Sequence, residues 1–215
     1  MTIISHFPSR QSDPDGSRVS PLRTPVVVSA AHVHLTAATI EALFCDRYCL
    51  HALHPLGQPS LYEADETVTL IGPGGHLNHV PIVGPPRDEN QIEVSATDAR
   101  ILGISVPVRP SGQLVETPGI EIQGPRTHVR LESGLIRALR HVHMTPHEAQ
   151  ILGLRDGEHI DAATLAQPPV ILRDILVRVS RDSRLELHLD MDEAHALALQ
   201  SGDLVELRAH RAPAD

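Results

Sequence analysis

The stretch TPVVVSAAHVHLTAATIEALF (residues 24–44) predicts the unit on which the fold depends. Its β-branched run predicts a strand, and the apolar residues of its second half follow helical spacing. Thr36 stands between the two as a candidate helix N-cap. The same order recurs in RHVHMTPHEAQILGL (residues 140–154), where a capping box and a stop glycine mark the helix. The chain therefore repeats a strand, a His-Val-His pair and a short helix.

Short strand candidates, separated by Gly and Pro, fill most of the remaining chain. ETVTLIGPGGHLNHVPIVGPPR (66–87) and GIEIQGPRTHVRLESG (119–134) predict hairpins. We therefore expect a mainly β protein with two small antiparallel β-barrel domains, produced by internal duplication and capped by short α-helices. The expected segments are a disordered N-terminal tail (1–24), a first barrel half (25–114), a second barrel half (115–208) and a frayed C-terminal tail (209–215).

Composition narrows the range of functions. The 215 residues are 41% hydrophobic but only 2% aromatic, so the cores must be built from Val, Ile and Leu. A formal charge of −9 and the scarcity of aromatic rings argue against nucleic acid as a partner. No apolar run reaches the length of a membrane span, so no membrane partner is expected. Fifteen histidines are the unusual feature and point to metal or proton chemistry.

The two His-Val-His pairs are candidate metal ligands. Side chains at positions i and i+2 of a strand share a face, so His32 lies beside His34 and His141 beside His143. Two imidazoles on one face can bind a single ion. A pair of surface histidines is the alternative for either motif alone, and the repetition in one strand-to-helix context favours the metal.

Three further residues stand out from their surroundings. His188 interrupts the alternating strand LELHLD, and Glu93 places a carboxylate in the β-rich run QIEVS. Either side chain could simply face solvent. Arg87 follows a Gly-Pro-Pro turn, where an arginine is normally a surface charge but could clamp phosphate beside a metal.

Several motifs in colinear order resemble the phosphate propanoyltransferases of the propanediol-utilisation type. The resemblance runs from about residue 25 to about residue 208 and rests on five stretches taken together: VSAAHVHLT (28–36), ETVTLIGP (66–73), GPPR with QIEVSATDA (84–99), RHVHMT (140–145) and LELHLDMDEA (185–194). Ala96 and His195 depart from the pattern, since relatives commonly have Arg and Asn there. These differences leave every expected metal ligand in place.

The resemblance implies a fold, an activity and a set of site residues. Family members are zinc-dependent phosphotransacylases with two small β-barrels and an active site between them. They exchange an acyl group, propanoyl or acetyl, between coenzyme A and inorganic phosphate. Carried onto this sequence, one Zn²⁺ would be bound by His32, His34 and Glu93, a second Zn²⁺ by His141, His143 and His188, phosphate by the catalytic Arg87, and coenzyme A by Val27, Val28, Ser29 and His195.

Two other functions stay open from the sequence. A di-zinc hydrolase such as a thioesterase would use the same ligands, and a non-catalytic metal-binding or shell-interaction module would use the histidines for assembly. We expect a cytoplasmic protein, because no secretory signal is visible near Met1. Prolines break residues 1–24, so a targeting helix for a bacterial microcompartment is not expected there, and a homo-oligomer and association with a shell are left open.

Overall fold

The computed structural model describes residues 22–209. The predicted tails therefore fall mostly outside the described residues, although Arg23 and Thr24 already belong to the first strand. The described helices are α1 (Ala37–Leu43), α2 (Ala96–Leu102), α3 (Pro146–Leu152) and α4 (Met191–Ala196). The described strands are β1 (Arg23–Ser29), β2 (His32–His34), β3 (Ala52–Pro55), β4 (Tyr62–Ile71), β5 (His76–Gly84), β6 (Gln91–Glu93), β7 (Val108–Arg109), β8 (Ile120–Gln123), β9 (His128–Leu131), β10 (Leu135–Ala138), β11 (His141–Met144), β12 (His159–Thr164), β13 (Ile171–Val179), β14 (Glu186–Asp190) and β15 (Leu204–Ala209).

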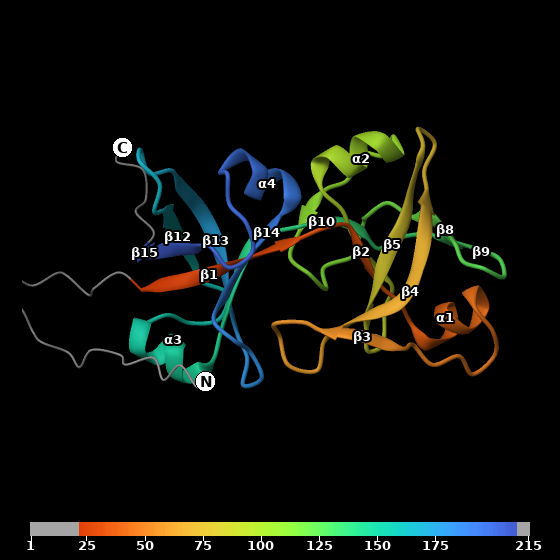
Figure 1. Cartoon of the computed structure of the whole chain (residues 1–215), viewed down its shortest axis with the longest axis horizontal. Coiled ribbons are helices and arrows are strands. Elements are labelled where there is room, and N and C mark those ends of the chain that lie inside the picture. The colour runs from red at the N-terminus through yellow and green to blue at the C-terminus, as the bar shows by residue number, and fades with distance from the viewer. Residues whose placement is uncertain (1–21, 210–215) are drawn as a thin grey trace, which may run out of the picture.

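These strands form two lobes, which lie side by side in Figure 1. The barrel lobe is a closed barrel in the order β1-β14-β11-β13-β12-β15. The sheet lobe is a curled sheet in the order β7-β10-β6-β2-β5-β4-β8-β9, with β3 paired to β4. The expected mainly β fold with short helices is confirmed, as are the hairpins β4–β5 and β8–β9. Not every pairing is antiparallel, because β1–β14, β11–β13, β2–β5 and β10–β6 are parallel.

The lobes exchange one strand each. β1 precedes the first His-Val-His pair but belongs to the barrel lobe, where it pairs with β14 and β15. β10 precedes the second pair but belongs to the sheet lobe, where it pairs with β6 and β7. The chain thus changes lobe at residues 30–31 and again at 139–140. Figure 1 shows β1 running out of the barrel lobe towards β2.

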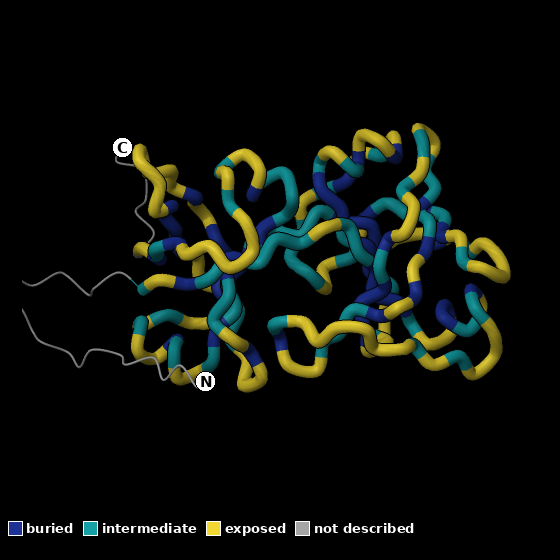
Figure 2. The backbone as a smooth tube through the Cα atoms, viewed as in Figure 1, coloured by how far each residue is buried: buried dark blue, intermediate teal, exposed yellow. Residues whose placement is uncertain are grey.

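Each lobe has its own hydrophobic core, and each exchanged strand contributes to the core of the lobe that it joins. Val26 of β1 is buried in the core of the barrel lobe, and Leu135 of β10 is buried in the core of the sheet lobe. Dark segments in the interior of both lobes in Figure 2 mark these cores. Aliphatic side chains dominate the buried positions, as the shortage of aromatic residues required. Because each exchanged strand is held by buried apolar contacts, the crossings are fixed parts of the fold.

The duplication is visible in the helices that follow the ligand strands. Thr36 caps α1 and Thr145 caps α3, each accepting from the backbone N–H three residues later. α2 and α4 begin in the same way at Ser95 and Asp190, both with capping boxes. These two helices meet across the lobes, where Asp192 accepts a 2.7 Å hydrogen bond from the backbone N–H of Thr97.

Within residues 22–209 no helix has the length and apolar character needed to cross a bilayer. The cytoplasmic location expected from the sequence stays a prediction.

Candidate active site

A cavity of about 830 Å³ lies between the lobes. The exchanged strands bring both His-Val-His pairs to it, since each pair begins directly after a crossing. Every site residue expected from the sequence lines this cavity except His195, which is exposed in the last turn of α4. The expected residues that line it are Val27, Val28, Ser29, His32, His34, Arg87, Glu93, His141, His143 and His188.

The first cluster consists of His32, His34 and Glu93. β2 and β6 pair antiparallel with His32 opposite Glu93, so the carboxylate projects on the same face as the two rings. Glu93 Oε2 lies 3.6 Å from His32 Nε2, and Glu93 Oε1 lies 3.9 Å from His34 Nε2. One potential ligand atom from each residue lies within 4.8 Å of the others, which suits a single metal ion.

The second cluster consists of His141, His143 and His188. β11 and β14 pair antiparallel with His141 opposite His188, in the same relation as the first cluster. The Nε2 atoms of His141 and His143 lie 3.2 Å apart, and the ring of His188 stacks 5.0 Å from that of His141. These three residues also offer ligand atoms within 4.8 Å of one another. His188 Nε2 is buried and has no hydrogen-bond partner among the described residues.

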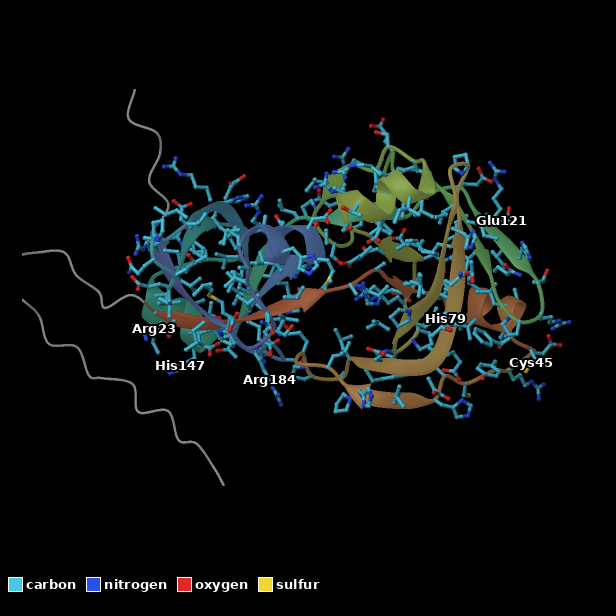
Figure 3. The ribbon with its side chains drawn as sticks, turned by 45° about the horizontal axis from the view of Figure 1, so that its top comes forward. Arg23, Cys45, His79, Glu121, His147 and Arg184 are labelled. Carbon is cyan, nitrogen blue, oxygen red and sulfur yellow. The ribbon has the colours of Figure 1, made fainter. Side chains whose placement is uncertain are left out.

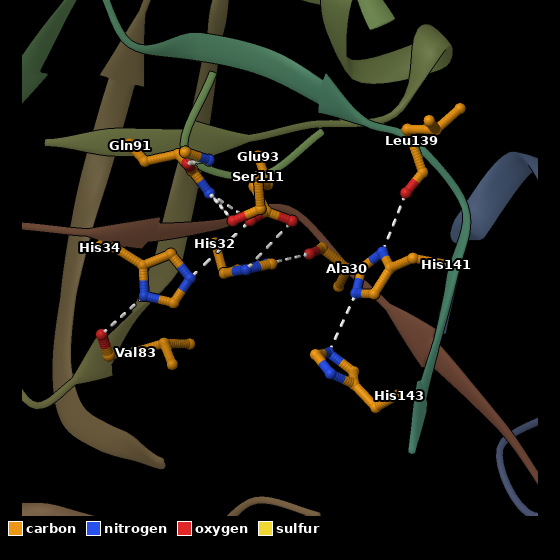
Figure 4. Close-up of polar contacts among 11 residues, drawn as sticks. Ala30, His32, His34, Val83, Gln91, Glu93, Ser111, Leu139, His141 and His143 are labelled. Carbon is orange, nitrogen blue, oxygen red and sulfur yellow. Dashed lines mark hydrogen bonds and ion pairs between the residues drawn. The ribbon is translucent and has the colours of Figure 1, made fainter. Parts of the chain in front are cut away.

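Backbone carbonyls orient three of the five imidazoles. His32 Nδ1 lies 2.9 Å from the oxygen of Ala30, and His141 Nδ1 lies 2.9 Å from the oxygen of Leu139, at matching places in the two repeats. His34 Nδ1 lies 3.1 Å from a third carbonyl, as Figure 4 shows. A carbonyl only accepts, so Nδ1 carries the proton and Nε2 keeps its lone pair. This arrangement is the one that metal-binding histidines adopt, so both clusters fit a divalent ion.

Comparisons with known proteins agree with this geometry. The family model for phosphate propanoyltransferase matches residues 25–200. The chain is 44% identical to a phosphate propanoyltransferase of Alkaliphilus metalliredigens, over 85% of this chain and 86% of that protein. It is 45% identical to one from Thermotoga maritima, over 84% and 86%, and 44% identical to one from Salmonella typhimurium, over 80% and 82%. The chain belongs to the phosphate propanoyltransferase family. It is therefore an acyltransferase, as the resemblance implied.

Burial favours the neutral form of His34, His141 and His143. Burial, with His32 and Arg87 nearby, lowers the pKa of His34 to about 3. Burial and the neighbouring rings lower the pKa of His143 to about 3 and that of His141 to about 4. Neutral imidazole is the form that binds a metal, so these rings need not lose a proton near neutral pH to accept one.

Glu93 is the charged member of the first cluster. Burial would raise its pKa, but the nearby imidazoles and Arg87 reverse that effect and lower it. His141 of the second cluster is among the groups that act on Glu93, so the clusters lie close enough to influence each other. Figure 4 shows His141 and His143 of the second cluster beside the three residues of the first. Residues of both clusters line the same cavity.

Among the described residues, two arginines line the cavity, and only Arg87 was expected there. Arg87 is held where its backbone N–H donates to the oxygen of Leu35, directly after β2. Burial lowers the pKa of its guanidinium, Glu93 opposes that effect, and Arg178 adds to it. Arg178 lies on β13 beside His143 and lines the same cavity. Its position in the alternating strand RDILVRVS looked like that of an ordinary solvent-facing charge.

The outer residues of the clusters were also missed. Gln91 donates to Glu93 Oε1 at 2.6 Å, and Glu186 Oε2 lies 3.6 Å from His188 Nε2. Both are polar residues two places before a third ligand, a signal that the sequence did contain. The two cysteines are exposed and free, and Figure 3 places Cys45 at the far end of the sheet lobe, away from the barrel lobe.

Proposed function

We propose that this protein is a phosphotransacylase that converts propanoyl-CoA or acetyl-CoA and inorganic phosphate into acyl phosphate and coenzyme A, using two zinc ions per chain. The observation that carries the proposal is the meeting of two three-ligand clusters and two arginines in one cavity. The family assignment supports the reaction type. The names of the relatives support propanoyl as one acyl group.

The ligand sets suit zinc. One ion would be held by His32, His34 and Glu93, and the other by the three histidines of the second cluster. Three protein ligands leave a coordination position open, which is typical of catalytic rather than structural zinc. Bound there, zinc would supply a Lewis acid for the carbonyl oxygen and a soft partner for sulfur.

The residues of the chain then position the two substrates. Arg87, with Arg178 beside it, would hold phosphate through paired N–H donors. The segment Val27–Ser29, at the end of β1, would lie along the coenzyme A thioester, since all three residues line the cavity. Holding both reactants in this way converts an encounter of two molecules into a positioned reaction. His195 is proposed to contact a more distant part of coenzyme A, at the exposed end of α4.

The reaction needs no protein nucleophile. An oxygen of hydrogen phosphate forms a bond to the thioester carbonyl carbon, and the C–S bond breaks with its electron pair going to sulfur. The proton of hydrogen phosphate ends on the released thiol. The family assignment favours this transfer over the hydrolase and the non-catalytic module considered above.

A product assay with and without a chelator tests the proposal. Purified protein is given propanoyl-CoA or acetyl-CoA, with and without phosphate, and both thiol release and acyl phosphate are measured. We expect acyl phosphate to form in step with thiol, only when phosphate is present, and we expect activity to fall after chelation and return with Zn²⁺. Thiol release without phosphate, giving free acid, would identify a thioesterase instead.

A further inference from the structure

The two clusters have outer positions that correspond through the duplication. In the antiparallel pair β2–β6, His34 lies opposite Gln91. In the antiparallel pair β11–β14, His143 lies opposite Glu186. Gln91 and Glu186 therefore occupy the same place in the two repeats, each two residues before the third ligand of its cluster and on the same face of the strand.

The first of these positions supports its neighbour directly. The Gln91 side-chain amide donates to Glu93 Oε1 at 2.6 Å and to the hydroxyl of Ser111 at 2.8 Å. Its own oxygen accepts from the backbone N–H of Gly112 at 2.7 Å. A fully bonded amide holds the Glu93 carboxylate in one orientation, and outer contacts of this kind commonly tune metal sites.

The second position carries a carboxylate instead. Glu186 Oε2 lies 3.6 Å from His188 Nε2, beyond hydrogen-bond distance but close enough for its charge to act there. Glu186 is not part of the group whose ligand atoms lie within 4.8 Å of one another, so it sits outside the second cluster. The buried Nε2 of His188 has no other polar partner among residues 22–209.

Glu186 is held in place from the other lobe. The Gln58 amide, in the β3–β4 loop of the sheet lobe, donates to Glu186 Oε2 at 2.9 Å and to the Arg184 carbonyl at 3.2 Å. The Arg184 backbone N–H donates back to Gln58 Oε1 at 3.2 Å. Figure 3 shows Arg184 at the edge of the barrel lobe that faces this loop. The contact is so close that a Cβ on Gly57 would clash with both carboxylate oxygens of Glu186.

The different charges of the two clusters explain the contact between Gln58 and Glu186. The first cluster includes a carboxylate, whereas the second consists of three imidazoles that carry no charge when neutral. A divalent ion in a largely buried site needs a nearby negative charge, and Glu186 is placed to provide it. We propose that Glu186, from its place beside His188, offsets the charge of the second ion, and that Gln58 holds it there across the lobes. This inference rests on the proposed metal binding of the second cluster.

Metal affinity of the isolated second cluster tests the inference. The double variant His32→Ala/His34→Ala removes the first site and serves as the background. Co²⁺ is titrated and its visible absorption recorded, and Zn²⁺ affinity is measured by competition with a chelator. Adding Glu186→Gln should weaken binding by about 10- to 100-fold and change the cobalt spectrum. Gln58→Ala should act in the same direction, less strongly.

Two further variants distinguish an effect of Glu186 on metal binding from an effect that only joins the two lobes. Glu63→Gln removes another carboxylate that lines the cavity but belongs to neither cluster, and it should leave metal affinity unchanged. Glu186→Asp keeps the charge and should recover part of the lost affinity. Unchanged affinity and spectrum in Glu186→Gln, with only a lower melting temperature, would overturn the inference. If the background with Glu186 intact bound no cobalt, the metal assignment itself would fall.

Discussion

The two ligand clusters share one frame but place their negative charge differently. In each, a His-x-His strand pairs antiparallel with a strand that brings the third ligand opposite the first histidine. The first cluster uses Glu93 as that ligand, with neutral Gln91 outside it. The second uses His188, with Glu186 outside it. Each site thus has one carboxylate, directly among the ligands in one case and one step away in the other.

A duplicated frame can therefore give two unequal sites. An ion bound by two imidazoles and a carboxylate keeps a net charge near +1, whereas an ion bound by three imidazoles keeps its full charge. Because Glu186 stands one step away rather than among the ligands, an ion held in the second site would be less fully neutralised and would attract an anion such as phosphate or a thiolate more strongly. Arg178 strengthens this field, because it lies beside His143 in the barrel lobe.

Loss of one ligand from either cluster should have the largest effect. We expect His32→Ala and His141→Ala each to lose about one of two bound zinc ions and to lower kcat/KM at least about 100-fold, because both sites serve one cavity. Metal analysis of the purified variants, together with the phosphate-dependent assay, checks this. Full activity in a variant that retains a single zinc ion would show that one cluster is dispensable.

Removal of the arginines should be the next largest effect. Losing a hydrogen bond to a charged group costs about 1.5–3 kcal/mol, so Arg87→Ala should raise the KM for phosphate roughly 10- to 150-fold while zinc stays bound. Arg178→Ala should raise the KM for phosphate less than Arg87→Ala does, because Arg87, which lies against the first cluster, is still present in that variant. Arg173→Ala, which removes an exposed arginine from the same strand, is the control. Equal KM values in all three variants would contradict the assignment.

Acid should destabilise the metal-free protein through both clusters. In the folded state the pKa of His34 and that of His143 are about 3, below the value of about 6.5 for unfolded histidine. As the pH falls below about 6.5, these histidines become protonated in the unfolded chain but stay neutral in the folded protein. The free energy of unfolding therefore decreases down to about pH 3. Urea unfolding in chelator at pH 7.5, 6 and 5 measures this loss.

His143→Gln should make the free energy of unfolding less dependent on pH over that range. Burial lowers the pKa of two rings of the second cluster, His141 and His143, and that of His34 in the first. His143→Gln should therefore reduce the loss of unfolding free energy on acidification. If the free energy of unfolding of this variant depends on pH as it does in the parent protein, the His143 ring is not buried as described.

Helix caps should show the smallest difference between the repeats. Thr145 and Glu148 form a complete capping box in α3, with three hydrogen bonds between them, whereas Thr36 caps α1 without one. Replacing a capping threonine by alanine costs about 1 kcal/mol. We expect Thr145→Ala to cost somewhat more than Thr36→Ala in urea unfolding with zinc present, and the reverse order would show that the box adds nothing.

Local features of this chain were readable from the sequence because they depend on neighbours along the chain. Strand periodicity put His32 beside His34, and the Thr145 cap and the β4–β5 hairpin followed from residue types at short spacing. Glu93 and His188 were visible as polar residues in β-rich runs, but only the family resemblance suggested that they were ligands. Glu186 gave the same kind of signal two residues earlier and was overlooked.

The repeated strand–histidine–helix units, the aliphatic cores and the family could all be inferred from the residues in order along the chain. The exchange of β1 and β10 between the lobes could not, and that exchange brings both clusters, Arg178 and Gln58 to a single cavity. The difference lies in how far apart along the chain the interacting residues are. Caps and periodicity act over a few residues, whereas partner strands are selected by burial of side chains such as Val26 and Leu135 against residues far away in the chain.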